Sequence, residues 1–473
     1  MKTSFLSQSL LYATATIAPV LVNFAITPVI TRLLGAEAYG VIGIGISLFQ
    51  FGIVIFTLGL AASITRQAII EDSGRPGAVA TVIQGAASSV VLFLLCAALL
   101  PHWGRLILPG AGDGVLLYPL ASCFGLALLQ NSQSFLRAEQ RAGTFVALGI
   151  SASLTGPLFG VGIVLAFGPG PALYLAGLAC GHVTVGIIAM LVCLKIQKPM
   201  FAKGQFLSNL RVGLPTVPHQ IAVSFMTLTV VSASSHLVGL DAAGGLQLAL
   251  LIGSAPMLLL GALNNAWAPY VYRARPEERG EILAGSYRSV MLLTAAMVCG
   301  FAVLAPIVVP FVAGPMAQSA PVLQASLIAA LGTPFMTSYL ANIHMVFISG
   351  RTGALAITTP ISAVVSLSLV FVPVLFGVPG DIRLFSLAIP IFQLSQLVSS
   401  IVLRRKRVDI VLPALGVLPE FFTVSAVLTT SFLFAHAPVV YGTLSAIIVL
   451  ILILARRNLI MNYFESWRSA SVV

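Results

Sequence analysis

Long apolar runs dominate this chain, and each is long enough to cross a lipid bilayer as a helix, which takes about 20 predominantly apolar residues. Hydrophobic side chains make up 58% of the 473 residues, and the mean hydropathy is +1.05. Charged residues make up only 8%, against about 25% in an ordinary globular protein, so polar side chains are too few to cover a water-soluble surface. The sequence therefore predicts an all-α integral membrane protein and excludes a large soluble catalytic domain.

Charged or Gly/Pro-rich loops divide the chain into about fourteen expected spans. The runs are apolar on all sides, whereas strands of a membrane β-barrel alternate apolar and polar residues, so helices are expected. The first run follows Lys2 like a signal peptide, but it extends to about Ile30, which is too long, and we interpret it as a retained helix. The expected limits are 6–30, 40–63, 78–100, 115–135, 145–167, 172–194, 215–238, 246–268, 286–312, 321–345, 354–376, 384–403, 411–434 and 437–455.

The distribution of Lys and Arg among the loops predicts which side of the membrane each loop faces. With the N-terminus placed inside, 21 of the 24 Lys and Arg residues fall on inner segments, and only Arg32, Arg105 and Arg383 fall outside. Because cytoplasmic loops collect such cations, both termini are expected to be cytoplasmic. Topology then accounts for the formal net charge of +11, with anionic membrane lipids as partners and no nucleic acid.

The five cysteines lie in or beside apolar runs and form no CxxC pair. They are expected to be small buried side chains. The sequence indicates no disulfide framework, metal site or cofactor.

Two pairs of loops indicate an internal duplication. The segment Thr31–Gly40 (TRLLGAEAYG) and the segment Ser235–Gly244 (SHLVGLDAAG), 204 positions apart, share four identical residues. Arg141–Gly143 and Arg351–Gly353 repeat at an offset of 210. Each copy then has six spans, an even number, so the copies are expected to be parallel repeats related by an axis along the membrane normal. The expected divisions are 1–200 and 201–408 for two six-helix lobes and 409–473 for an appended helix pair.

A duplicated helical bundle without a soluble domain is typical of an alternating-access carrier, in which two lobes rock around a central cavity. Short motifs in both halves also resemble those of the Wzx-type oligosaccharide flippases. These motifs are Thr31–Gly40 followed by Ser63–Arg66 (SITR) in the first half, and Gly213–Pro215 (GLP) and Asn264–Tyr270 (NNAWAPY) in the second. Such flippases are polysaccharide transporters of the superfamily that also holds the multidrug MATE exporters and the lipid II flippases.

The resemblance implies a MATE-like fold and a cargo carried on a polyprenyl diphosphate. It implies movement of that lipid-linked oligosaccharide from the inner to the outer leaflet of the bacterial inner membrane, for O-antigen, exopolysaccharide or capsule assembly. A polysaccharide polymerase and glycosyltransferases of the same pathway would be partners.

Cations are needed to neutralise a diphosphate, and the planar fork of Arg suits phosphate oxygens. Arg66 and Arg273, at the inner ends of the second and eighth expected spans, are 207 positions apart and are the candidates for one cavity mouth. An inner-side topology anchor is the somewhat favoured interpretation of each. Arg32 and His236 occupy the matched outer position of the two copies and could help release the head group, or could be helix-end side chains that reach toward the interface.

Other polar residues inside the apolar runs are candidates for coupling, gating and sugar contacts. His219 could accept a coupling proton, although a lone histidine in such a place is more often simply hydrogen-bonded. Pro19 and Pro28 interrupt the first span and could let it bend as a gate helix. Uncharged side chains suit sugar hydroxyls, although hydrogen bonds between helices explain them as well. They are Asn23, Gln50, Asn264 and Asn265.

Three other classes of membrane protein compete with a flippase. A polysaccharide polymerase or ligase would keep a sizeable outer loop with basic residues, whereas the outer loops here are short. An ATP-driven pump needs a P-loop, and the chain has no Gly-Lys dipeptide. A MATE-type exporter of cationic compounds would need buried carboxylates, and only Glu420 falls within an expected span.

Overall fold

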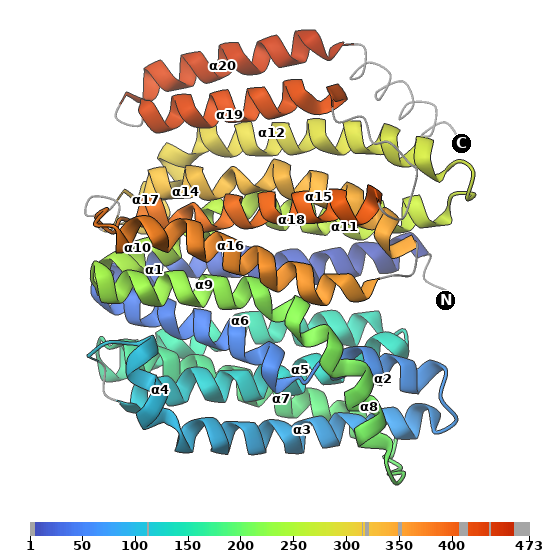
Figure 1. Ribbon diagram of the computed structural model, residues 1–473. Coiled ribbons are helices and arrows are strands. Elements are labelled where there is room, and N and C mark those ends of the chain that lie inside the picture. Colours follow the sequence, from blue (N-terminus) through green and yellow to red (C-terminus); the bar gives the residue numbers. More distant parts are fainter. Residues whose placement is uncertain are drawn as a thin grey trace. The chain divides into compact units, whose positions relative to one another are not determined.

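The computed structural model describes residues 5–110, 113–314, 316, 321–348, 352–405, 415–434 and 437–457. The side chains of residues 5–20, 113, 266, 352, 415, 438, 439 and 441 lie outside this description. Every regular element in the described part of the chain is a helix (Figure 1). Ten of these helices are long and apolar enough to cross a membrane, and two shorter apolar helices follow near the C-terminus. The integral membrane class is confirmed, and the count of fourteen spans stays a prediction.

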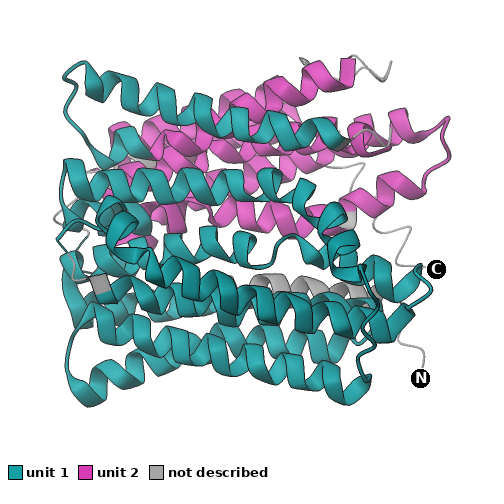
Figure 2. Ribbon diagram, turned by 60° about the horizontal axis from the view of Figure 1, so that its bottom comes forward, with its two compact units in different colours: residues 1–248, 312–320, 353–385 teal, residues 249–311, 321–352, 386–473 magenta. Residues whose placement is uncertain are grey.

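The helices form two compact units (Figure 2). Unit 1 comprises residues 1–248, 312–320 and 353–385, and unit 2 comprises residues 249–311, 321–352 and 386–473. These units are divided differently from the expected lobes 1–200 and 201–408, which remain a prediction about the repeat. The helices of unit 1 are α1 (Phe5–Phe56), α2 (Leu60–Ile69), α3 (Gly74–Ala98), α4 (Leu100–Ile107), η1 (Asp113–Leu116), α5 (Leu117–Ala138), α6 (Ala142–Phe167), α7 (Pro171–Ile196), α8 (Gln205–Gly213), η2 (Leu214–Thr216), α9 (Val217–Leu237) and α16 (Leu355–Leu375).

Four elements cross the boundaries between the units. They are α10 (Leu240–Gly253), α12 (Arg279–Ala313), η3 (Thr352–Ala354) and α17 (Ile382–Ser386), of which only the last residue belongs to unit 2. The remaining helices belong to unit 2. They are α11 (Ala255–Arg273), α14 (Val322–Ala330), α15 (Gly332–Ile348), α18 (Ala388–Arg405), η4 (Leu415–Val417), α19 (Leu418–Leu433) and α20 (Pro438–Ala455).

Helix α1 contains the first expected span and most of the second. Its two segments join at Gly35, whose φ of 79° lies in the left-handed region that only glycine adopts at little cost. The second segment ends at Phe56, and Leu58 and Gly59 then take φ values of 52° and 66° before α2 begins. A left-handed leucine is uncommon and strained, so the chain is bent at a defined place between α1 and α2.

Small residues let α5, α6 and α7 of unit 1 pack backbone against backbone. A Cβ on Gly125 would lie 2.5 Å from the carbonyl carbon of His182, and one on Gly177 would lie 2.5 Å from the Cα of Gly160. Inside a bilayer the hydrophobic effect does not drive helices together, so close contact of small residues is a main source of packing energy. The core beside these helices is apolar, with Phe135 and Leu136 fully buried.

Helix α8 turns polar side chains toward α2 and α3, unlike an ordinary surface helix. Gln205 Nε2 donates to the carbonyl of Gly77 at 2.7 Å, and Asn209 Nδ2 donates to Thr81 Oγ1 at 2.8 Å. Ser63 Oγ on α2 donates to the carbonyl of Asn209 at 2.7 Å. These bonds fix α8 to the inward faces of α2 and α3.

Unit 2 is held by a series of buried polar contacts. The hydroxyls of Thr294 and Thr337 lie 2.9 Å apart, joining α12 to α15. On α19, Glu420 is 1% exposed and accepts two bonds from the Arg456 guanidinium, at 2.6 and 2.9 Å. The expected intramembrane carboxylate is therefore neutralised by the residue that follows α20.

Candidate functional site

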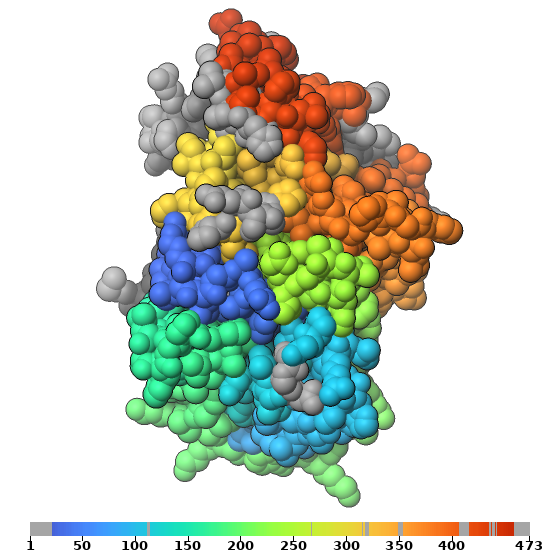
Figure 3. Space-filling view, turned by 90° about the vertical axis from the view of Figure 1, so that its left-hand side faces the viewer, coloured from blue at the N-terminus to red at the C-terminus, as the bar shows by residue number. Residues whose placement is uncertain are grey.

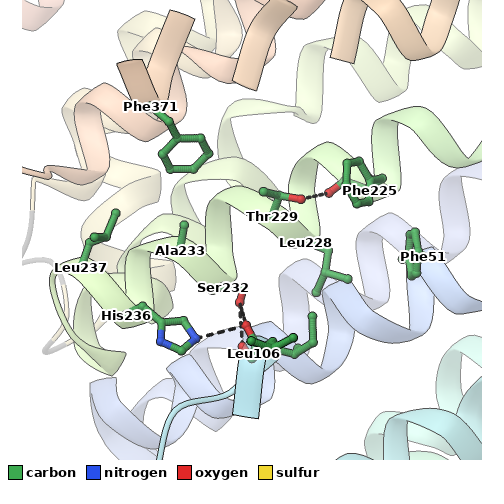
Figure 4. Close-up of a pocket in the computed structure, with 11 residues that line it drawn as sticks. Phe51, Leu106, Phe225, Leu228, Thr229, Ser232, Ala233, His236, Leu237 and Phe371 are labelled. Atoms are coloured by element: carbon green, nitrogen blue, oxygen red, sulfur yellow. Dashed lines mark hydrogen bonds between the residues drawn. The ribbon is translucent and has the colours of Figure 1, made fainter. Parts of the chain in front are cut away.

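One face of α9 gathers polar and aromatic side chains around a cavity of about 500 Å³ in unit 1 (Figure 4). Phe225, Thr229, Ser232 and His236 recur at helical spacing, so they share this face. The other walls come from Phe51 on α1, from Leu106 and Ile107 at the end of α4, and from Phe371 on α16. Its lining is therefore largely apolar, with its polar atoms concentrated beside α4.

Two polar side chains of this cavity, Ser232 and His236, are engaged with the end of α4, whereas the Thr229 hydroxyl donates to the carbonyl of Phe225 within α9. Ser232 Oγ donates to the carbonyl of Ile107 at 2.7 Å, and His236 Nε2 lies 3.1 Å from the carbonyl of Leu106. The last carbonyls of a helix have no partner within it, so these side chains complete α4. A carbonyl only accepts, which places a proton on Nε2 of His236.

Near the start of α9, His219 contacts a different helix. Its Nδ1 lies 2.7 Å from Oγ1 of Thr359 on α16, and Thr359 is buried while the His219 side chain is half-buried. A threonine hydroxyl both donates and accepts, so the contact suits a neutral ring and a protonated one. The geometry is compatible with proton uptake, and the coupling role stays a prediction.

The two predicted phosphate-binding arginines lie at helix ends. Arg66, in the last turn of α2, is exposed, and its Nε lies 2.9 Å from Glu71 Oε1. Arg273 is the last residue of α11 and is exposed. Because Arg66 belongs to unit 1 and Arg273 to unit 2, their pairing across one mouth remains a prediction.

The other end of unit 1 carries the predicted outer residues, and we name it the Arg32 end. Arg32 is exposed and donates through Nη1 to the carbonyl of Pro28 at 2.8 Å. Far along the chain, after α16, Arg383 donates through Nε to both carboxylate oxygens of Asp381 at 3.0 Å. The hydrogen bonds from Arg383 hold the pKa of Asp381 below its usual range, so this cation is compensated over the physiological range.

The remaining predicted site residues fall on α1 and α11. Asn23 and Gln50 are exposed on α1, and Pro28 is buried within it, whereas the Pro19 side chain lies outside the description. On α11, Asn265 is exposed and Asn264 is half-buried. The Oδ1 atom of Asn264 is buried and accepts no hydrogen bond within the described structure.

The sequence did not point to two polar contacts inside the helices. Arg404, expected in an inner loop, is only 8% exposed at the end of α18, and its Nε donates to Asn342 Oδ1 at 2.7 Å. Ser47 Oγ donates to Gln247 Oε1 at 3.0 Å, with both side chains buried. A polar residue in an apolar run was the available signal, but the partner lies far away in the chain.

Comparison with known proteins places this architecture in a family. The family model described as polysaccharide biosynthesis protein matches residues 5–274, more than half of the chain. No curated protein matches.

Solved membrane transporters have a similar fold. An inward-facing multidrug resistance MATE transporter of the MOP superfamily superposes with a TM-score of 0.66 at 16% identity, over 83% of this chain and 94% of that chain. The lipid II flippase MurJ, in an inward closed conformation, superposes with a TM-score of 0.66 at 14% identity, over 96% of this chain and 100% of that chain. An outward-facing MATE transporter superposes with a TM-score of 0.58 at 15% identity, over 84% of this chain and 94% of that chain. The chain has the fold of these transporters and belongs to the polysaccharide biosynthesis protein family.

Proposed function

We propose that the protein is an alternating-access flippase for a polyprenyl-diphosphate-linked oligosaccharide in the bacterial inner membrane. The observation that carries this proposal is the family match over residues 5–274. The similarity of fold to a lipid II flippase over 96% of the chain supports it. The Wzx-type motifs in both halves support the same assignment. Its role is to move the cargo for assembly of a surface polysaccharide, and it catalyses no bond change.

The buried charges favour an anionic cargo over a cationic one. Among the described residues, Glu420 is the buried carboxylate, and Arg456 is paired with it. Binding a cation within a bilayer calls for a carboxylate that is open to the cation. This distribution supports a flippase over a MATE-type exporter of cationic compounds.

The site residues take the following roles in this proposal, with both termini cytoplasmic. Arg66 and Arg273 attract the diphosphate at the inner mouth, since charge-assisted hydrogen bonds hold phosphate oxygens well. Arg32 and His236 act at the opposite mouth, where the head group leaves. Asn264 offers its buried amide oxygen to a sugar hydroxyl.

We also propose that an apolar cavity in unit 2 takes the lipid chain of the cargo. A cavity of about 790 Å³ is lined by α11, α12 and α20, with Leu263, Ile282, Leu293 and Leu452 among its walls. Such a lining fits the isoprenoid part of the cargo, which must stay in an apolar environment while the head group crosses.

The proposal is tested by depleting the protein and measuring the sidedness of the lipid-linked oligosaccharide. In spheroplasts, a membrane-impermeant oxidant of sugars should label much less of this lipid after depletion, because the head group stays in the inner leaflet. Restoring the gene should restore the labelling. Unchanged sidedness, or a change only in sensitivity to cationic dyes, would contradict a flippase and favour an exporter.

A further inference from the structure

The repeated loops of the sequence meet in space, and they meet reciprocally. A Cβ on Gly40 of α1 would overlap the carbonyl oxygen of Leu240 on α10, and a Cβ on Gly244 of α10 would lie 2.7 Å from the carbonyl oxygen of Ala36 on α1. Gly244 is the repeat equivalent of Gly40, and Leu240 is that of Ala36, at the same offset of 204. The two contacts are therefore exchanged by the repeat, as expected around a local two-fold axis.

A third pair of equivalent positions lies beside this axis. Gly43 and Gln247 are also 204 positions apart, and a Cβ on Gly43 would lie 2.8 Å from both Cβ and Cγ of Gln247. The Gln247 side chain occupies the space that a side chain at residue 43 would need, and its Oε1 accepts the bond from Ser47. Among the contacts described for this crossing, backbone atoms therefore meet directly, and one side-chain hydrogen bond, from Ser47 to Gln247, joins the two helices.

Both crossing segments are bounded by left-handed backbone. The α1 segment begins after Gly35 (φ 79°) and ends before Leu58 and Gly59 (φ 52° and 66°). The α10 segment begins after Gly239, with a φ of 140°. Helix breaks of this kind are places where a segment can change direction while the helices on either side stay intact.

The crossing lies at the Arg32 end of unit 1. Figure 3 looks onto this end, where the blue residues of α1 lie directly beside the yellow-green residues around the start of α10. The two halves of the duplicated sequence therefore close against each other here.

We propose that the Gly40–Gly244 crossing is the gate that seals the Arg32 end of the transport path and separates when the cargo leaves. This inference rests on the alternating-access function proposed above. A backbone-to-backbone contact excludes water when closed, and its few side-chain contacts let it part without repacking interlocked side chains. The hydrogen bond from Ser47 to Gln247 sets the register in which it closes again.

A reversible cross-link tests whether the crossing must open. In the full chain with its five native cysteines replaced by alanine, Gly43→Cys and Gln247→Cys together should form a disulfide on oxidation, since their Cβ positions lie within reach. Oxidation should stop transport and reduction should restore it. Gly162→Cys with Gln247→Cys is the matched control, because Gly162 on α6 has no atom within 4 Å of its Cβ position. The proposal would be overturned if the cross-linked protein transported as fast as the same protein after reduction of its disulfide. It would also be overturned if the two cysteines did not cross-link.

A second measurement needs no substrate. Gly40→Val and Gly244→Val should prop the crossing apart and slow the cross-link between residues 43 and 247 about tenfold, the effect of roughly 1.4 kcal/mol of overpacking. Gly162→Val should leave the rate unchanged, and gel filtration of each variant in detergent checks that it is folded. Gly40→Ala serves where valine prevents folding. An unaltered rate in the folded Gly40 variants would refute the gate.

The two experiments separate this inference from the function on which it rests. The cross-linking results could come out as expected while depletion of the protein leaves the lipid-linked oligosaccharide on its normal side. That combination would refute the proposed cargo and still support the gate.

Discussion

The cationic side chains at the ends of the helices differ in what already neutralises them. Arg66 has Glu71 as its partner, but both side chains are about half exposed, at 52% and 41%. An exposed pair of this kind contributes little to stability, so a phosphate can displace the carboxylate at small cost. Arg404 and Arg456, in contrast, are engaged with Asn342 and Glu420 and hold unit 2 together. Exposure therefore distinguishes Arg66, for which we propose a role in cargo binding, from Arg404 and Arg456, which are engaged within the fold.

Replacing Arg66 by alanine should therefore reduce transport without reducing protein level. One charge-assisted hydrogen bond to phosphate is worth about 1.5–3 kcal/mol, which corresponds to a loss of roughly 10- to 100-fold in the rate. Glu71→Gln is the matched control, since it removes the ion pair and keeps the arginine. Transport by Arg66→Ala at the parental rate would show that Arg66 only anchors topology.

His219 contacts a hydroxyl that accepts or donates, so its protonation need not disrupt α9 and α16. We expect His219→Gln to transport with a weaker dependence on the proton gradient, because glutamine keeps a hydrogen bond and cannot take up a proton. Thr359→Val removes the hydroxyl but keeps the imidazole, and it should shift the pH profile without flattening it. Vesicles with an imposed pH gradient supply the measurement. A His219→Gln protein with the parental gradient dependence would exclude the coupling role.

At the scale of the element, the bend between α1 and α2 is set by close backbone contact. A Cβ on Gly59 would overlap the carbonyl oxygen of Gly213, where α8 passes into η2, and Gly59 also has a left-handed φ. Gly59→Ala should therefore destabilise the protein by about 2 kcal/mol, since the left-handed strain alone costs roughly 1–2 kcal/mol. Its apparent unfolding temperature in detergent should fall.

Gly162→Ala provides the contrast in the same fold. Gly162 lies inside α6 in open space, so alanine should stabilise the helix by at most about 1 kcal/mol. If the two variants unfold at the same temperature, the bend does not depend on the glycine at residue 59.

The elements also show how far the sequence can be interpreted alone. Apolar length located the helices, because burial in a bilayer demands it, and the repeat located Gly40 and Gly244. The expected spans 6–30 and 40–63 placed a break around Gly35, but they did not predict that a single kinked residue there would leave α1 continuous from Phe5 to Phe56. The partners of His219, Ser47 and Arg404 could not be predicted, because they lie 140, 200 and 62 positions away and depend on how helices pack.

For the whole molecule, orientation in the membrane decides what the proposed gate does. The crossing of α1 and α10 lies beside Arg32, which the charge distribution predicts to be outside. If the chain were inserted the other way, the same contact would seal the cytoplasmic side and the cargo would leave in the opposite direction. The gate and the direction of transport are therefore tied to one fact of topology.

Reporter fusions measure that topology directly. Alkaline phosphatase inserted in the loop between α16 and α17 should be active, because this enzyme folds only outside the cytoplasm, and a green fluorescent protein fused at the C-terminus should be fluorescent. The reason is the asymmetry of charge, since 21 of the 24 cations fall on the expected inner segments, each favouring that side by about 1 kcal/mol next to anionic lipid. Phosphatase inserted in the loop between α7 and α8, which carries Lys198 and Lys203, should be inactive. The reverse pattern of activities would place the Gly40–Gly244 crossing on the cytoplasmic side and reverse the role assigned to each mouth.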